Sequence, residues 1–230
     1  MLTSAKISVI IHNYIIISRL VDTRRRFKSN KQALNGNYLQ SMMVCHWIGP
    51  ELIPNVKIAK FWDQIALKDE EQTAIHAIQI AMDVDVERIT MIGDDYPRFR
   101  GRRPIVKIKS HNPVSLKSLG NGAVRLFSTA LAMTNCTNGF LLIDEVENGI
   151  HHSIQHQYWN MVLSIAKHYN IQIFATTHSI DCVKGFARAA INSGEEGVLY
   201  RLEKRGHKLA AIRYSEEELA AAAKFNTEVR

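Results

Sequence analysis

Two carboxylates follow a run of four apolar residues in the middle of the chain. Phe140–Ile143 has the composition of a strand buried on both faces of a sheet, and Asp144 and Glu145 come directly after it. Open α/β sheets place their ligands at the carboxyl ends of such strands. There Asp144 could hold Mg²⁺, which prefers oxygen ligands, and Glu145 could polarise a water that attacks a γ-phosphate. The alternative interpretation is a strand that ends in a solvated acidic turn.

A histidine ends the next predicted strand. Ile171–Thr177 is a second apolar run, and it leads directly into His178. The stretch between the two strands has helical spacing, and strand–helix–strand predicts a parallel sheet with a right-handed crossover. The separation of 34 residues (178 − 144) fits one helix and one strand, so His178 should reach the same edge as Asp144. It could bond a γ-phosphate there, or it could simply cap the following helix.

A glycine-bearing turn, Ser118–Gly122, precedes a predicted helix. Glycines let backbone amides approach an anion, and a helix N-terminus carries partial positive charge. Ser118, Gly120, Asn121 and Gly122 are therefore candidate nucleotide contacts, although many turns before helices share this pattern.

The order and spacing of the three motifs resemble the ABC ATPase superfamily. In that superfamily a signature loop precedes the Walker B strand and a switch histidine follows it; here Ser118 and Asp144 are 26 residues apart (144 − 118). The segment Glu147–His151 resembles a D-loop. The resemblance is closest to predicted AAA-type ATP-binding proteins near the overcoming-lysogenization-defect and SMC-like ATPases, and it is strong over Ser115–Ser179.

This resemblance implies a fold and a set of roles. The fold would be α/β, an incomplete ABC-type version of the RecA-like P-loop NTPase core, and the ligands would be ATP and Mg²⁺. Asp144 would serve the metal, Glu145 would be the general base and His178 would sense the γ-phosphate. Ser118, Gly120 and Gly122 would face nucleotide bound to a partner protomer. The family also implies coupling to DNA maintenance or anti-phage defence.

One motif of the family is missing from the sequence. No glycine in the 230 residues is followed by lysine, so the phosphate-binding G-x-x-x-x-G-K-[ST] does not occur. We therefore expect a truncated or split ATPase, completed by a homodimer or by a partner that bears a P-loop. The rival hypothesis is a non-catalytic, degenerate ATPase module that binds a protein partner or DNA.

Two other kinds of site are weighed against this one. Ser179, His178 and Asp144 could form a hydrolase triad, but no G-x-S-x-G elbow is present and adjacent side chains at a strand end point different ways. His152 and His156 share a helix face and have His151 beside them. Because no H-E-x-x-H order accompanies them, a solvated helix start is the better interpretation of these histidines.

Composition bounds the setting of the protein. The net charge of +7 permits contact with nucleic acid without showing it, and the basic runs at 24–26 and 98–103 are typical of solvated loops. Three cysteines without a C-x-x-C pair favour a reduced, cytoplasmic protein. The apolar stretch Ile7–Leu20 is too short and polar to span a bilayer, so we expect one or two buried strands and no membrane contact.

The chain divides into a mixed N-terminal lobe, residues 1–112, and a core, residues 113–230. In the lobe, Asp69 and Gln72 have the spacing of a capping box before a helix, and Arg88–Ile92 and Ile105–Lys109 read as strands. The core should end in a hairpin of Val198–Leu202 and Leu209–Tyr214, followed by a short helix at Glu216–Phe225.

Overall fold

The computed structural model describes residues 14–18, 44–93, 101–193, 197–205, 208–214 and 218. Its strands and helices follow one another along the chain in this order: β1 (Tyr14–Ser18), β2 (Cys45–Ile48), α2 (Asn55–Ile65), α3 (Glu70–Met82), β3 (Val86–Gly93), β4 (Arg102–Ile108), β5 (Val114–Ser115), the 3₁₀ turn η1 (Leu116–Leu119), α4 (Asn121–Thr134), β6 (Phe140–Ile143), the 3₁₀ turn η2 (His152–Ile154), α5 (Gln155–His168), β7 (Gln172–Thr177), α6 (Ile180–Ser193), β8 (Gly197–Arg205) and β9 (Lys208–Tyr214).

The larger of two sheets has the strand order β2-β6-β7-β1-β8-β9. Strands β6 and β7 pair in parallel, as the strand–helix–strand pattern predicts. Strand β2, which the pattern did not include, pairs parallel to β6 on its other side. Strand β1 lies between β7 and β8 and runs antiparallel to both, so the sheet as a whole is mixed. The predicted C-terminal hairpin is present as the antiparallel pair β8–β9. The predicted helix at Glu216–Phe225 lies outside the described residues except for Glu218.

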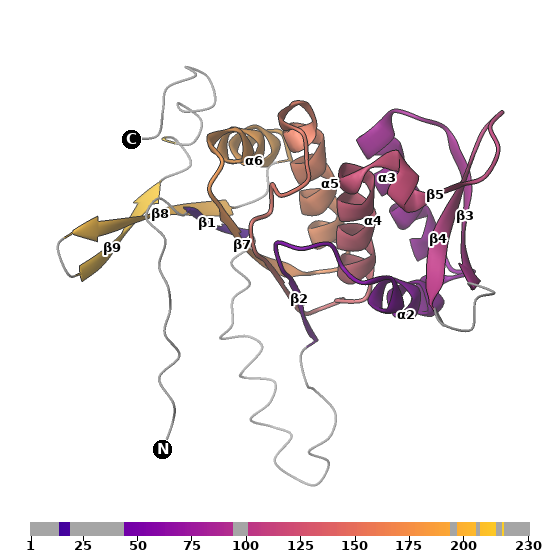
Figure 1. Ribbon diagram of the computed structural model, residues 1–230. Helices are drawn as coiled ribbons and strands as arrows, with labels where there is room; N and C mark the ends of the chain where they lie inside the picture. The colour runs from indigo at the N-terminus through magenta and orange to yellow at the C-terminus, as the bar shows by residue number, and fades with distance from the viewer. Residues whose placement is uncertain are drawn as a thin grey trace, which may run out of the picture.

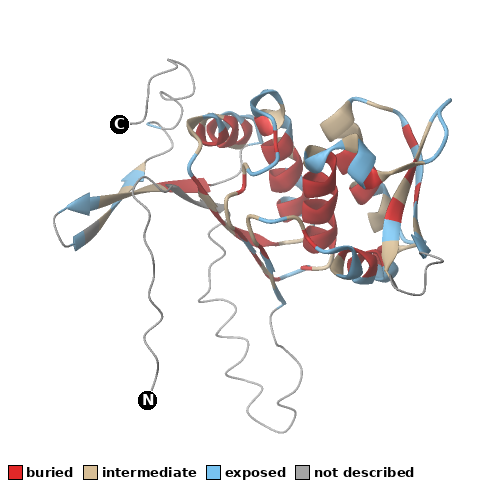
Figure 2. Ribbon diagram, viewed as in Figure 1, coloured by how far each residue is buried: buried red, intermediate tan, exposed pale blue. Residues whose placement is uncertain are grey.

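Helices α4, α5 and α6 lie together on one side of this sheet (Figure 1). Every residue of α4 from Ala123 to Thr134 is buried, and Figure 2 shows α4 and α5 as largely buried ribbons. In α5 the buried residues recur at helical spacing, including Tyr158, Val162 and Ile165. The core therefore lies between the sheet and these helices and anchors the strand ends from that side.

The other face of the sheet is more open than the sequence predicts. Leu142 of β6 is 37% exposed, and its register partner Trp47 of β2 is 57% exposed. The expectation that Phe140–Ile143 is buried on both faces is therefore wrong. Leu141 and Ile143 are buried, whereas the alternate residues Phe140 and Leu142 stay half-exposed or exposed because successive side chains of a strand point to opposite faces.

The second sheet, ordered β3-β4-β5, lies mostly within residues 1–112, the predicted N-terminal lobe, and α2 and α3 lie beside it. The two predicted strands of this lobe form the antiparallel pair β3–β4. Helix α3 begins after Asp69 as predicted, but the capping box is wrong: Asp69 has helical backbone angles and makes no side-chain cap bond. The division at residue 112 stays a prediction, and β5 lies just past it and pairs with β4.

Two predictions about charge and membranes concern the surface. Of the basic residues at 98–103, Arg102 and Arg103 belong to strand β4 rather than to the predicted loop. Arg102 also forms a bidentate ion pair with Asp63, at 2.6 and 2.7 Å. The run at 24–26 lies outside the described residues, as do residues 98 and 100. No helix in the described part of the chain is long and apolar enough to cross a membrane.

Candidate functional site

The carboxylates and the histidine meet at one edge of the larger sheet. Strands β6 and β7 run parallel, with Ile143 opposite Ala175, so the residues that follow both strands leave the sheet at the same edge. Asp144 and Glu145 follow β6 at this edge, and His178 follows β7. The predicted convergence of these three residues is confirmed by the strand pairing.

Thr176 binds both residues of the acidic turn. Its Oγ1 donates a hydrogen bond to Asp144 Oδ1 and accepts one from the Glu145 amide at 3.0 Å. The Asp144 amide in turn donates to the Ile48 carbonyl on β2, at 2.8 Å. The backbone and one carboxylate oxygen of Asp144 are thus fixed by two neighbouring strands.

Glu145 and His178 approach each other across the strand ends. Glu145 Oε1 lies 3.8 Å from His178 Nε2, and the two side chains are 40% and 35% exposed. The His178 amide donates to Glu147 Oε1 at 2.8 Å, which ties the histidine to the segment after the acidic turn. Glu145 itself has a positive φ of 47°, a conformation that costs free energy for any residue with a Cβ. A carboxylate and an imidazole that face each other and remain open to solvent can both contact a bound ligand.

The glycine-bearing turn is built as the sequence predicts. The 3₁₀ turn η1 leads to Gly120, whose φ of +94° suits glycine, and α4 begins at the next residue, Asn121. Ser118, Gly120 and Asn121 are exposed, and Gly122 is half-buried. A Cβ on Gly122 would lie 3.1 Å from the Gly149 carbonyl oxygen. The turn therefore packs directly against the segment Glu147–His151 that follows the carboxylates.

Comparisons with known proteins identify the family. The family model described as an AAA ATPase domain matches residues 21–183, a range that holds the glycine-bearing turn, both carboxylates and His178. The chain belongs to this family of ATPase domains.

One relative and one solved structure complete the comparison. An uncharacterized protein of Methanocaldococcus jannaschii is 31% identical over 101 residues, which are 44% of this chain and 89% of that protein. A structure from work on ATP-driven dimerization and DNA-stimulated activation of SMC ATPases matches with a TM-score of 0.48 at 10% identity. It covers 71% of this chain and 93% of its own.

Two residues of the ATPase domain that sequence reasoning missed, Thr176 and Arg125, hold the edge in place together with Glu147 of the segment that resembles a D-loop. Thr176 and Glu147 bind the acidic turn and the His178 amide, as described above. Arg125 of α4 is 1% exposed and donates from Nη2 to the carbonyl oxygens of Asp144, at 3.0 Å, and Glu145, at 3.2 Å. An arginine among the apolar residues of a buried helix face was the available signal.

The alternative sites receive no support from the geometry. Ser179 Oγ accepts a 3.3 Å hydrogen bond from the Cys182 amide, which makes Ser179 the cap of α6 rather than a nucleophile. The alternative role expected of His178 is to cap the following helix. The residue that caps α6 is instead Ser179, one position later. His151 bonds Ser153, and His156 lies within bonding distance of Asn160 and Asn192. No group of three metal-ligating side chains occurs among the described residues.

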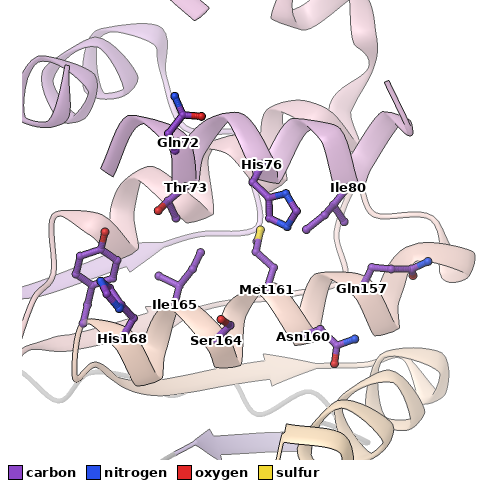
Figure 3. Close-up of a pocket in the computed structure, with 11 residues that line it drawn as sticks. Gln72, Thr73, His76, Ile80, Gln157, Asn160, Met161, Ser164, Ile165 and His168 are labelled. Atoms are coloured by element: carbon purple, nitrogen blue, oxygen red, sulfur yellow. The ribbon is translucent and has the colours of Figure 1, made fainter. Parts of the chain in front are cut away.

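A cavity of about 650 Å³ lies elsewhere, between α3 and α5. Side chains of both helices point into it, and His76 and Met161 face each other across it (Figure 3). Neither the acidic turn nor His178 contributes to its lining. The carboxylates therefore lie at the sheet edge and not in this cavity.

Proposed function

We propose that this ATPase domain supplies the carboxylate and signature part of a site that binds and hydrolyses ATP. The observation that carries the proposal is the meeting of Glu145 and His178, 3.8 Å apart, at adjacent parallel strand ends. The same edge holds Asp144, and ligands of open α/β sheets bind at such edges. Membership of the AAA ATPase domain family supports the choice of nucleotide.

Each residue would have a distinct role in this reaction. Water would attack the γ-phosphorus, the bond to the β–γ bridging oxygen would break, and ADP and phosphate would leave. Glu145 would accept the proton of the attacking water, and His178 would donate a hydrogen bond to a γ-phosphate oxygen. Both side chains are exposed enough to reach a ligand without rearrangement of the core.

Asp144 is the residue that would hold Mg²⁺. One of its carboxylate oxygens is bonded to Thr176, which orients the group and leaves the second oxygen for a ligand. Magnesium binds proteins through one or two carboxylates and retains several waters, so a single aspartate fits this ion. The bound ion would neutralise charge on the phosphates, while Thr176 holds the aspartate in position.

A second protomer or a P-loop-bearing partner would complete the site. Ser118, Gly120 and Asn121 lie exposed at the start of α4, where a helix N-terminus favours an anion, and Gly122 lies half-buried in the first turn. By family resemblance these residues contact nucleotide held by the partner. Analytical ultracentrifugation of the chain with a P-loop-bearing homologue should then show association that requires ATP.

Nucleotide binding tests the proposal directly. A fluorescent ATP analogue is titrated into the purified chain with Mg²⁺ or with EDTA, for wild type, Asp144→Asn, Glu145→Gln and the control Asp83→Asn. Asp83 is an exposed carboxylate at the C-terminal end of α3, a helix that supplies none of the candidate site residues. We expect Mg²⁺-dependent binding that Asp144→Asn weakens and that the other two variants preserve. Binding that is equally strong in Asp144→Asn and in EDTA would contradict the assignment of the metal.

Hydrolysis separates the role of the base from that of binding. In a form of the protein that includes a P-loop, Glu145→Gln should lower the turnover rate about 10²- to 10⁴-fold, the usual contribution of a positioned general base. ATP affinity should change little, because phosphate and metal contacts remain. Turnover that survives Glu145→Gln would refute this role.

The second candidate function is a non-catalytic module that binds a protein partner or DNA. It is favoured by one observation: within the 230 residues no glycine is followed by lysine, as the phosphate-binding motif G-x-x-x-x-G-K-[ST] requires. A chain that binds duplex DNA but no nucleotide, at the same salt concentration, would support this alternative. Coupling to DNA maintenance or defence belongs to the family resemblance and is testable by the same DNA titration.

A further inference from the structure

Arg125 joins three separate segments through backbone carbonyls. Its Nη1 donates to Gly49 O at 2.6 Å and to Glu51 O at 3.4 Å, in the loop between β2 and α2. Its Nη2 donates to the carbonyls of Asp144 and Glu145. The guanidinium is thus shared between a loop of the N-terminal lobe and the acidic turn, while its own backbone belongs to α4.

The environment of this arginine is unusual for a buried charge. Buried charges are normally paired, and no carboxylate lies within ion-pair distance of Arg125 among the described residues. Its Nε also lacks a hydrogen-bond partner there. Among the described residues, the guanidinium is thus stabilised by hydrogen bonds to four backbone carbonyl oxygens. The carbonyl groups are therefore held facing the guanidinium, because a buried charge without hydrogen-bond partners would strongly destabilise the fold.

The two carbonyls of the acidic turn determine the direction of the Glu145 side chain. The Asp144 carbonyl belongs to the peptide plane before the Glu145 Cα, and the Glu145 carbonyl belongs to the plane after it. Holding both planes fixes φ and ψ of Glu145, and these angles fix the direction of its Cα–Cβ bond. The positive φ of 47° would otherwise relax toward an ordinary value, since a residue with a Cβ disfavours it.

Arg125 also lies close to the glycine-bearing turn. It comes one turn into α4, which begins at Asn121 directly after Gly120. A displacement of the turn moves the start of α4, and the bidentate guanidinium would carry that displacement to the peptide planes of Glu145. Arginine is suited to this task because its donors form a rigid planar fork, whereas a lysine ammonium is a flexible point donor.

We propose that Arg125 is the positioning residue for Glu145 and the link through which the glycine-bearing turn, Ser118–Gly122, influences it. The functional meaning of this link rests on the proposed ATPase site, in which Glu145 is the base and the turn contacts a partner's nucleotide. The link itself is a property of the chain alone and can be measured without nucleotide.

Amide exchange by NMR tests the positioning role. In wild type the Glu145 amide is bonded to Thr176 Oγ1, and the Asn148 amide is bonded to the Glu145 carbonyl at 2.9 Å. Arg125→Lys should raise exchange at these two amides about 10-fold or more relative to the β7 amides Ile173 and Ala175. The ring signal of His178 should shift as well, because Glu145 lies beside it.

The matched control is Leu131→Ala, a fully buried position later in the same helix. It creates a cavity in the core and should raise exchange at all four amides by a common factor, through global destabilisation. Equal acceleration at all four amides in Arg125→Lys would overturn the positioning role. The same selective pattern in Leu131→Ala would overturn it too.

A double-variant cycle tests the link to the turn. Gly120→Ala perturbs the turn through its backbone alone, because φ is +94° and an added Cβ meets nothing within 4 Å. It should shift the Glu145 amide resonance in wild type and by less than half as much in the Arg125→Lys background. Equal shifts in both backgrounds would overturn the link. Failure of ATP binding with intact exchange and cycle results would refute the proposed function and leave the link standing.

Discussion

The positive φ of Glu145 predicts that glycine is more stable than alanine at this position, the opposite of what is expected inside a helix. A residue with a Cβ costs about 1–2 kcal/mol in the left-handed region, and glycine avoids most of that cost. At φ 47°, Glu145→Gly should therefore be more stable than Glu145→Ala by about 1 kcal/mol. Both variants lose the same carboxylate, so the comparison isolates the backbone.

An exposed helical position supplies the reference for this comparison. His76 lies within α3 and is exposed. In a helix interior glycine is about 1 kcal/mol less stable than alanine, so His76→Gly should be less stable than His76→Ala. The unfolded-state entropy of glycine relative to alanine is common to both pairs and cancels between them. The two Gly-minus-Ala differences should thus have opposite signs and lie about 2 kcal/mol apart.

Urea unfolding followed by circular dichroism measures all four variants. A change of 1 kcal/mol corresponds to about 2–4 °C in Tm for a chain of this size, so thermal scans give an independent check. A Glu145 pair with the same sign as the His76 pair would show that Glu145 carries no backbone strain.

Two further predictions concern the core. Burial raises the pKa of Cys136 to about 11 and that of Cys182 to about 12, so both thiols stay protonated at pH 8. Iodoacetamide should therefore label only the exposed Cys45 in native protein and all three cysteines in urea, and mass spectrometry counts the labels. Labelling of Cys136 or Cys182 at the rate of Cys45 would contradict this. Gly139→Ala would place a methyl group 2.2 Å from the Val44 carbonyl oxygen and should lower the free energy of unfolding by about 2 kcal/mol or more. In the same unfolding assay, the control Gly101→Ala, whose added Cβ meets nothing within 4 Å, should change it by less than about 0.5 kcal/mol.

The sequence predicts which residues meet at this edge of the sheet because its signals are local and periodic. Apolar runs at 140–143 and 171–177 mark strands, and the residues that follow them must leave the sheet at its edge. The helix between them leaves little choice of topology. The placement of Asp144, Glu145 and His178 thus follows from the order of elements, without knowledge of any tertiary contact.

The errors arose where tertiary surroundings decide. Burial of β6 depends on what covers each face, and an apolar run does not reveal that Leu142 stays exposed. The cap at Asp69 failed because its backbone is helical, which the spacing to Gln72 does not encode. Arg125 was missed because its partners are backbone carbonyls far along the chain, and carbonyls have no sequence signature.

The contacts at the sheet edge distinguish side chains that have hydrogen-bond partners within the fold from one that is open to solvent. Asp144 is hydrogen-bonded to Thr176, and Arg125 compensates its buried charge with carbonyls, so both have structural reasons to be where they are. Glu145 is different. Its backbone is strained, its side chain is 40% exposed, and its carboxylate faces His178 at 3.8 Å.

Glu145 therefore combines an unfavourable backbone conformation with a side chain that is open to solvent. Strain of this kind, held in place by Thr176 and Arg125, is characteristic of functional sites, where the surrounding structure over-determines an unfavourable conformation. A purely structural module would be better served by glycine at the same turn. The geometry of Glu145 therefore favours the catalytic proposal over the non-catalytic one, and the comparison of Glu145→Gly with Glu145→Ala measures the free energy on which that argument depends.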